Sequence, residues 1–296
     1  MDEIIRSQIF DDALYELITR TATELPEDVV RALEQAREDE DEGSTARVVL
    51  SKYLENIDLA TKRRAPLCQD TGLPLFYISL PGCMPKDVVK EKIHLALIRA
   101  TEKQYLRPNA VDPLTGRNSG NNIGTGFPAL YFHDSRPGEL VIDLILKGGG
   151  SENVSTQYSL PHKELDAARD LEGVRRVVLD AVVKAGGKGC PPGVLGISIG
   201  GDRESGYRAA KKQFLRQIDD TNPHPLLRGL EERLFDDINS LGIGPQGLGG
   251  KTTVLAVKVT ALHRLPASYF VTVSYMCWAF RRRRLVLDNK GQYRIE

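Results

Sequence analysis

The sequence predicts an α/β fold: a mixed sheet surrounded by helices, with a helical segment at the N-terminus. Apolar residues recur at helical spacing through the first 66 residues, which predicts helices there. Beyond them, short apolar runs typical of buried strands alternate with helical patterns, and glycine-rich connections separate the two. The chain has 296 residues, 41% of them hydrophobic, so it can bury a sizeable core.

Three helices are expected in residues 1–66. The first covers 4–18, where Ile and Leu recur at helical spacing. The second starts at Pro26, since proline and the acids that follow it suit a first helical turn. The third follows Ser44. Between the last two, the acidic run 37–42 is interpreted as a solvated turn or helix end without a function.

The middle of the chain is expected to contain strands, a helix and one long loop. An apolar run at 73–80 predicts a buried strand, and Pro85 begins an amphipathic helix. Residues 104–126 are rich in Asn, Gly and Pro, and a loop of this length is typical of either a binding loop or disorder. Apolar strands on both sides favour an ordered loop. The strands that follow it are predicted at 130–132 and 140–146.

The second half continues the alternation to the end of the chain. No internal repeat or convincing linker is found, so residues 1–296 are predicted to form a single domain. The basic cluster 281–284 is interpreted as an exposed charged end, part of a C-terminal tail over 281–296. Helices are expected at 163–185, 203–218 and 225–240, and strands at 194–199, 254–259 and 270–273.

Composition argues against several kinds of partner. Forty Lys and Arg residues balance forty Asp and Glu residues, so no overall field favours nucleic acid or an anionic membrane. No apolar run approaches the roughly 20 residues of a membrane span, and the acidic N-terminus lacks the apolar core of a secretory signal. Four cysteines are too few for a disulfide framework, which indicates a reducing, cytoplasmic location.

Three cysteines are candidates for an iron–sulfur site. Cys68 opens Cys-Gln-Asp-Thr-Gly, Cys190 lies in Gly-Cys-Pro-Pro-Gly, and Cys277 lies at a strand end beside a tryptophan. Three thiolates leave one iron of a cubane cluster without a protein ligand, and that iron can bind a substrate oxygen. Asp70, close to the first thiol, can move protons. Structural zinc sites usually take close cysteine pairs, which this sequence lacks, whereas spacing alone does not exclude Cys83 as a ligand.

Two glycine-rich runs can turn backbone N–H groups toward an anion. The first, 147–153, contains three consecutive glycines. The second, 242–252, ends in Gly-Lys-Thr like a phosphate-binding loop, but Pro245 stands where that motif needs glycine. Turn glycines leading into a strand are the preferred interpretation, with ATP binding as a distant alternative. His263 closes a strand and is, taken alone, more often structural than catalytic.

Five motifs in order along the chain resemble the iron–sulfur hydro-lyases known as class I fumarases and L-tartrate dehydratases. The likeness runs from about residue 5 to 284. It is greatest to the α subunit of the two-subunit enzymes, which corresponds to the N-terminal domain of the single-chain form. The motifs are Cys-Gln-Asp-Thr-Gly from Cys68, Lys-Gly-Gly-Gly-Ser-Glu-Asn at 147–153, Gly-Cys-Pro-Pro-Gly at 189–193, the run at 243–252, and Cys-Trp-Ala from Cys277.

The resemblance implies a cofactor and its ligands. In this family three cysteines bind a 4Fe-4S cluster, and order and context assign the ligand role to Cys68, Cys190 and Cys277. Cys83 matches none of the family's ligand motifs. The second domain of the single-chain enzymes supplies further substrate-binding residues and has no counterpart in this sequence. A β subunit is therefore expected as partner, together with dimerisation of the α chains.

The same resemblance implies the residues that bind and convert a small dicarboxylate. Asp70 takes an acid/base role, and His263 is similar to the family's active-site histidine. The implied substrate contacts are Gln69, the forked guanidinium of Arg107, which suits a carboxylate, and the backbone near Gly149.

Reversible hydration of fumarate to L-malate, a step of the tricarboxylic acid cycle, is therefore the first expectation for function. Dehydration of L(+)-tartrate to oxaloacetate is the alternative, because the motifs serve both activities. An expectation of another class is a non-catalytic protein that binds a cluster or a small molecule. A β-like reading frame beside the gene would favour the enzyme.

Overall fold

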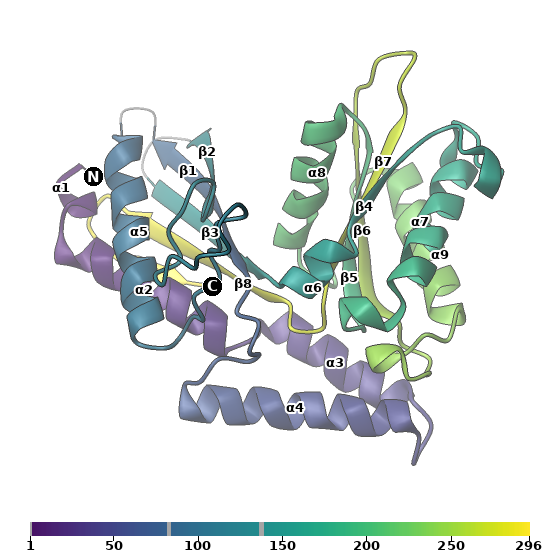
Figure 1. Ribbon diagram of the computed structural model, residues 1–296, viewed down its shortest axis with the longest axis horizontal. Helices are drawn as coiled ribbons and strands as arrows, with labels where there is room; N and C mark the ends of the chain where they lie inside the picture. The colour runs from purple at the N-terminus through teal and green to yellow at the C-terminus, as the bar shows by residue number, and fades with distance from the viewer. Residues whose placement is uncertain (1, 82–83, 136–138) are drawn as a thin grey trace. The chain divides into compact units, whose positions relative to one another are not determined.

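The computed structural model describes residues 2–81, 84–135 and 139–296 and confirms the α/β class (Figure 1). It contains two mixed sheets where one was expected, and the predicted N-terminal segment is helical. By its contacts the chain divides into two compact units, each built around one sheet. That the two units act as the single domain predicted from the sequence stays a prediction.

The two units are assembled from alternating stretches of the chain. Unit 1 contains Met1–Pro26, Asn56–Gly148 and Arg281–Glu296, and unit 2 contains Glu27–Glu55 and Gly149–Phe280. Each named strand lies wholly within one of the two units.

The N-terminal part has one helix break more than expected. The break falls near Ser7, whose hydroxyl donates to the carbonyl of Ile4 at 2.7 Å. The second expected helix begins at Glu27, and the carboxylates of Glu27 and Asp28 suit its N-terminal end. The helices are α1 (Asp2–Ile5), α2 (Gln8–Thr23), α3 (Glu27–Asp39) and α4 (Thr45–Arg63).

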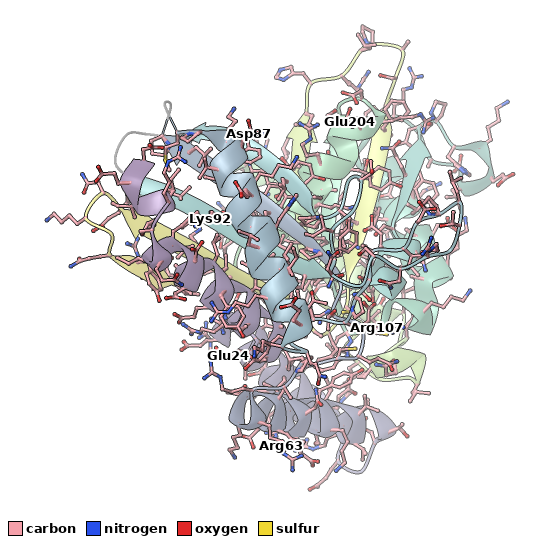
Figure 2. The ribbon with its side chains drawn as sticks, turned by 60° about the vertical axis from the view of Figure 1, so that its left-hand side comes forward. Glu24, Arg63, Asp87, Lys92, Arg107 and Glu204 are labelled. Atoms are coloured by element: carbon pink, nitrogen blue, oxygen red, sulfur yellow. The ribbon has the colours of Figure 1, made fainter. Side chains whose placement is uncertain are left out.

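Unit 1 has a five-stranded mixed sheet. The helices α2 and α5 (Lys86–Glu102) pack against one face of it (Figure 1). Lys92 of α5 also forms an ion pair with Asp11 of α2 at 2.8 Å (Figure 2). In sheet order the strands are β2 (Ala129–Ser135), β1 (Leu73–Pro81), β3 (Glu139–Lys147), β8 (Arg281–Asp288) and β9 (Tyr293–Ile295).

The core of unit 1 follows from alternation along these strands. Phe76 of β1, Leu144 of β3 and Leu285 of β8 are fully buried and share one apolar cluster with α2 and α5. Alternate side chains of a strand point to the same face, so the apolar positions of β1, β3 and β8 meet the helices together. β1 pairs parallel with β2, and the other neighbouring strands pair antiparallel.

The C-terminal residues do not form the exposed charged end expected from the sequence. They form β8, an inner strand between β3 and β9, and Arg281 and Arg282 are only 1% and 8% exposed. Leu285 and Leu287, later in β8, are fully buried and anchor the strand in the core. The arginines are therefore buried with it, although a charge run usually stays in solvent.

Unit 2 has a four-stranded mixed sheet with helices on both faces (Figure 1). One face carries α8 (Arg203–Lys212), and the other carries α7 (Leu171–Ala185) and α9 (Pro225–Ser240). In sheet order the strands are β4 (Thr156–Ser159), β7 (Phe270–Met276), β5 (Gly193–Gly200) and β6 (Val254–Leu262). Every residue of the inner strand β5 is buried.

One expectation about unit 2 was wrong in detail, and one of its strands was not anticipated. The helix expected at 163–185 begins at Leu171, because Asp170 caps it by accepting a hydrogen bond from the Gly173 N–H at 2.7 Å. The strand β4 was not anticipated, since it is a short edge strand in which only Tyr158 is buried. Neither its length nor its polar side chains give a clear period-2 signal.

Candidate active site

In unit 1 the loop 68–72 joins α4 to β1 and lies directly against the end of β3. Asp70 closes a tight turn, because its Oδ1 accepts from the Gly72 N–H at 3.0 Å. Gly72 has φ +84°, and a Cβ there would lie 2.9 Å from backbone atoms of Leu146 and Lys147. Only glycine combines this backbone conformation with so close an approach.

The same loop holds Arg107 by the backbone. The Thr71 hydroxyl oxygen accepts from the Arg107 N–H at 3.0 Å and from the Asn109 side-chain amide at 3.1 Å. The buried amide of Asn122 donates to the Arg107 carbonyl at 3.0 Å. The start of the long loop after α5 is therefore ordered, as predicted, and its Arg107 backbone is hydrogen-bonded to the loop that carries Cys68.

Exposure separates the candidate residues of unit 1. Gln69 and Arg107 are exposed, whereas Cys68 and Asp70 are half-buried. Arg281 is buried, and its Nη2 donates to the Asp70 carbonyl oxygen at 2.9 Å. Side chains that could meet a ligand thus stand on a backbone that is fixed from several sides.

In unit 2, Cys190 and Cys277 lie at the same end of the sheet. Cys190 comes just before β5 in a left-handed conformation with φ +54°, and Cys277 follows the last residue of β7. The Trp278 N–H donates to the Cys190 carbonyl at 3.1 Å, so the two cysteine backbones are adjacent. Both cysteines are half-buried, and neither forms a disulfide.

Tyr275 packs under these two cysteines. A Cβ at Gly189 or Gly193 would lie 2.6 or 2.5 Å from its ring, so both glycines leave room for the tyrosine. Burial raises the pKa of Tyr275, and the neighbouring sulfurs of Cys277 and Cys190 raise it further. The phenol is therefore neutral at physiological pH.

The part of the three-glycine run that belongs to unit 2 also lies at the cysteine end of its sheet, and it is helical. Residues Gly149–Asn153 form a short helix, α6. A Cβ at Gly150 would lie 3.5 Å from the Lys188 carbonyl oxygen, and the Ser155 hydroxyl accepts from the Tyr275 N–H at 3.1 Å.

The second glycine-rich run binds a carboxylate of the protein itself. Glu40 is only 4% exposed, and its carboxylate accepts from the N–H groups of Lys251 and Thr252 at 2.8 and 2.9 Å. This corrects the interpretation of the acidic run 37–42 as wholly solvated. Because the N–H groups of the Gly-Lys-Thr sequence already bind Glu40, the structural interpretation is favoured over a nucleotide site.

The second glycine-rich run, residues 242–252, also packs against the loop that carries Cys190. The Gln246 N–H donates to the Pro191 carbonyl at 2.9 Å, and a Cβ at Gly187 would lie 2.6 Å from the Gln246 carbonyl oxygen. The Tyr53 ring stacks on Trp278 with centroids 4.0 Å apart. The sequence reasoning missed these supports, because an acid or a tyrosine of a helical segment carries no motif.

His263 lies at the opposite end of the unit 2 sheet from the two cysteines. It follows the last residue of β6, which pairs with the last residue of β5, whereas Cys190 precedes the first residue of β5. The eight residues of β5 span about 26 Å. His263 is exposed and lines an open surface pocket with Arg264 and Tyr269.

The described residues of either unit, taken alone, contain no group of three His, Cys, Asp or Glu side chains that could hold a metal ion. Unit 2 carries two free cysteines on adjacent backbones, and unit 1 carries Cys68. Cys83, which the spacing did not exclude, lies outside the described residues. Among the helices that the structure describes, none has the length and apolar character needed to cross a bilayer.

Comparison with known proteins defines the class to which this α/β chain belongs. The sequence pattern of the fumarate hydratase (Fumerase) family matches residues 11–286, so the chain is a member of that family. This confirms the resemblance noted in the sequence.

The relatives divide between two activities. A provisionally named class I fumarate hydratase of Geobacillus stearothermophilus is 48% identical over 286 residues, which is 95% of this chain and 55% of that protein. A provisionally named L(+)-tartrate dehydratase subunit alpha of Methanocaldococcus jannaschii is 38% identical, over 94% of this chain and 98% of that protein. An Escherichia coli L(+)-tartrate dehydratase subunit alpha is 32% identical, over 90% and 86% respectively. The chain thus spans about half the length of the Geobacillus relative and most of the other two.

Proposed function

We propose that this chain is the α subunit of a 4Fe-4S hydro-lyase that adds water reversibly to a four-carbon dicarboxylate. Fumarate, giving L-malate, is the first choice of substrate. Membership of the fumarate hydratase family supports a hydro-lyase activity. The observation that carries the proposal is the hydrogen-bonded scaffold of unit 1, on which Asp70 and Arg107 flank Thr71 beside Cys68.

The proposed cluster ligands are Cys68, Cys190 and Cys277. Thiolates are the ligands that iron–sulfur clusters take, and two of these thiols lie on adjacent backbones, half-buried and outside any disulfide. When bound, a cluster with three protein ligands supplies a Lewis-acidic iron to a substrate hydroxyl. The cytoplasmic location is part of the proposal, because such ligands must stay reduced.

The chain's own polar residues have distinct proposed roles. Arg107 is exposed and makes no ion pair among the described residues, so its fork is available to a substrate carboxylate. Gln69 and the backbone near Gly149 are the further substrate contacts. Asp70 is the proposed acid/base group, since its carboxylate is oriented by the Gly72 N–H and lies two residues from a cluster ligand.

His263 is proposed to assist proton transfer, with one geometric condition. Within unit 2 it lies a strand's length from Cys190 and Cys277, so it does not face a cluster held by those thiols of the same chain. A second copy of the chain would have to supply it. The proposed dimerisation of α chains provides such a copy.

A β subunit is the remaining proposed partner. Two of the relatives named above carry the designation subunit alpha and have nearly the length of this chain, whereas the Geobacillus relative is about twice as long. We infer that the β subunit supplies the substrate-binding residues that the longer protein has in one chain.

The proposal is tested by anaerobic co-expression of the chain with a β subunit encoded beside it. Purified protein is assayed for iron and sulfide and for the loss of ultraviolet absorbance as fumarate is hydrated. Turnover of fumarate together with bound iron and sulfide is the expected result. Protein that is folded and loaded with a cluster but inactive on both fumarate and L(+)-tartrate would favour the non-catalytic alternative.

L(+)-tartrate is the second candidate substrate, favoured by the relatives whose length matches this chain. Both reactions remove a hydroxyl β to one carboxylate and a weakly acidic proton α to it, so the same residues serve either. The same preparation therefore separates them: oxaloacetate formed from L(+)-tartrate, at a higher kcat/KM than malate from fumarate, would assign the chain to tartrate.

A further inference from the structure

Arg281 is the largest of the fully buried side chains that the structure describes. It is the first residue of β8 and pairs with Leu146 of β3, next to the point where Gly72 approaches the β3 backbone. Its position therefore brings a guanidinium underneath the loop 68–72. Arginine stays charged in any protein environment, so a full positive charge is buried there.

Among the residues that the structure describes, the contacts of Arg281 do not include a negative charge that would balance its guanidinium. Its Nη2 donates to the Asp70 carbonyl oxygen at 2.9 Å, while Nε and Nη1 are buried and have no hydrogen-bond partner. Other arginines of the same strand differ: Arg283 pairs with Glu24 at 2.8 Å and Arg284 with Asp143 at 2.7 Å. A neutral carbonyl does not balance a buried cation, so the burial of Arg281 costs free energy of folding. A functional role would explain why the residue is retained despite this cost.

The neighbouring loop carries the groups that would supply the balancing negative charge. Cys68, as a proposed cluster ligand, is a thiolate, and Asp70 is a carboxylate. Because Nε and Nη1 are buried in the protein, Arg281 does not touch a substrate in this conformation. It acts on the loop through the Asp70 carbonyl and through its charge.

We propose that Arg281 is a positioning residue that fixes the Asp70 segment and matches the negative charge gathered there when cluster and dicarboxylate are bound. This inference rests on the proposed hydro-lyase function. Lysine keeps the charge but not the planar fork, whereas methionine keeps much of the volume without the charge. The two substitutions therefore separate geometry from charge.

The test uses the anaerobic complex of α and β subunits carrying Arg281→Lys or Arg281→Met, with Arg284→Lys as the matched control. Arg284 belongs to the same strand, but its side chain is 45% exposed and paired with Asp143. For Arg281→Lys we expect kcat per bound cluster to fall by about ten- to a hundredfold, with a smaller change in KM, because small displacements of a catalytic group cost this much. For Arg281→Met we expect a further loss and an altered electron paramagnetic resonance spectrum of the reduced cluster. The control is expected to keep the parent values.

Two results would overturn the inference. One is a lower melting temperature for Arg281→Lys with unchanged kcat per cluster, which would make the residue merely structural. The other is an equal loss in Arg284→Lys. If Arg281→Met does not fold, Arg281→Lys still decides the matter. Failure of the hydro-lyase proposal is distinguished by the parent complex itself being inactive on both diacids.

Discussion

Gly72 shows how a single backbone position sets the loop of the candidate site. For Gly72→Ala we expect a loss of roughly 2–4 kcal/mol in the free energy of unfolding, from the left-handed backbone together with contacts of 2.9 Å to β3. Gly116→Ala is the matched control, because Gly116 has φ +70° but nothing within 4 Å of a Cβ. It should cost only about 1 kcal/mol. Urea unfolding of both variants measures the difference, and equal losses would show that the contact with β3 is unimportant.

The cysteine ligands are tested one at a time. Cys68→Ser, Cys190→Ser and Cys277→Ser are each expected to lower the iron and sulfide content of anaerobically purified protein at least severalfold, because a cluster that loses a thiolate ligand is held less tightly. Cys83→Ser is the control and should keep the parent content. Loss of iron in the control, with retention in any of the three, would reassign the ligand set.

The turn between α3 and α4 holds the second glycine-rich run through Glu40. Removing the buried carboxylate in Glu40→Ala leaves the N–H groups of Lys251 and Thr252 without their acceptor, so we expect a loss of roughly 2–4 kcal/mol in the free energy of unfolding. Asp41→Asn is the control: Asp41 pairs with the Lys251 ammonium at 2.5 Å but is 78% exposed, and its loss should cost at most about 1 kcal/mol.

A second consequence concerns nucleotides. If the Gly-Lys-Thr sequence were a phosphate site, ATP would compete with Glu40 and raise the melting temperature of the parent protein. We expect no such shift, and a stabilisation by ATP would revive the nucleotide alternative.

Elements with a clear apolar period could be predicted from the sequence, and those shaped by single contacts could not. The N-terminal helices, β1, α5 and β5 follow their patterns closely. The start of α7 at Leu171, eight residues after the predicted start, was missed because a single side-chain cap at Asp170 decides it. The inner position of β8 was missed because four arginines in a row hide the buried leucines that follow them.

At the scale of the whole molecule, the position of His263 gives a prediction about assembly. Cys190→Ser should remove the cluster of its own chain, and His263→Asn should impair proton transfer at whichever cluster this histidine serves. If His263 serves the cluster of a second copy, hybrid dimers of the two variants contain one intact site and should regain activity that neither variant shows alone. Two affinity tags isolate the hybrid. An inactive hybrid, with active parent dimers as control, would exclude this role.

The sequence indicated which residues belong to the candidate site, but not how they contact one another. Motifs pointed to Cys190 and Cys277, and the structure adds that the Trp278 N–H binds the Cys190 carbonyl. No motif indicated that Arg281 lies beneath Asp70, because that contact joins residues 211 positions apart. Such long-range contacts depend on the pairing of β8 with β3, which sequence periodicity does not specify.

The alternating assembly of the two units also constrains how such a protein can evolve. Unit 1 is built from three separate stretches, so one recombination event between related genes cannot transplant it whole. An exchange that kept both units intact would need a junction at each of the places where the chain passes from one to the other. The two units of this fold are therefore expected to be inherited together.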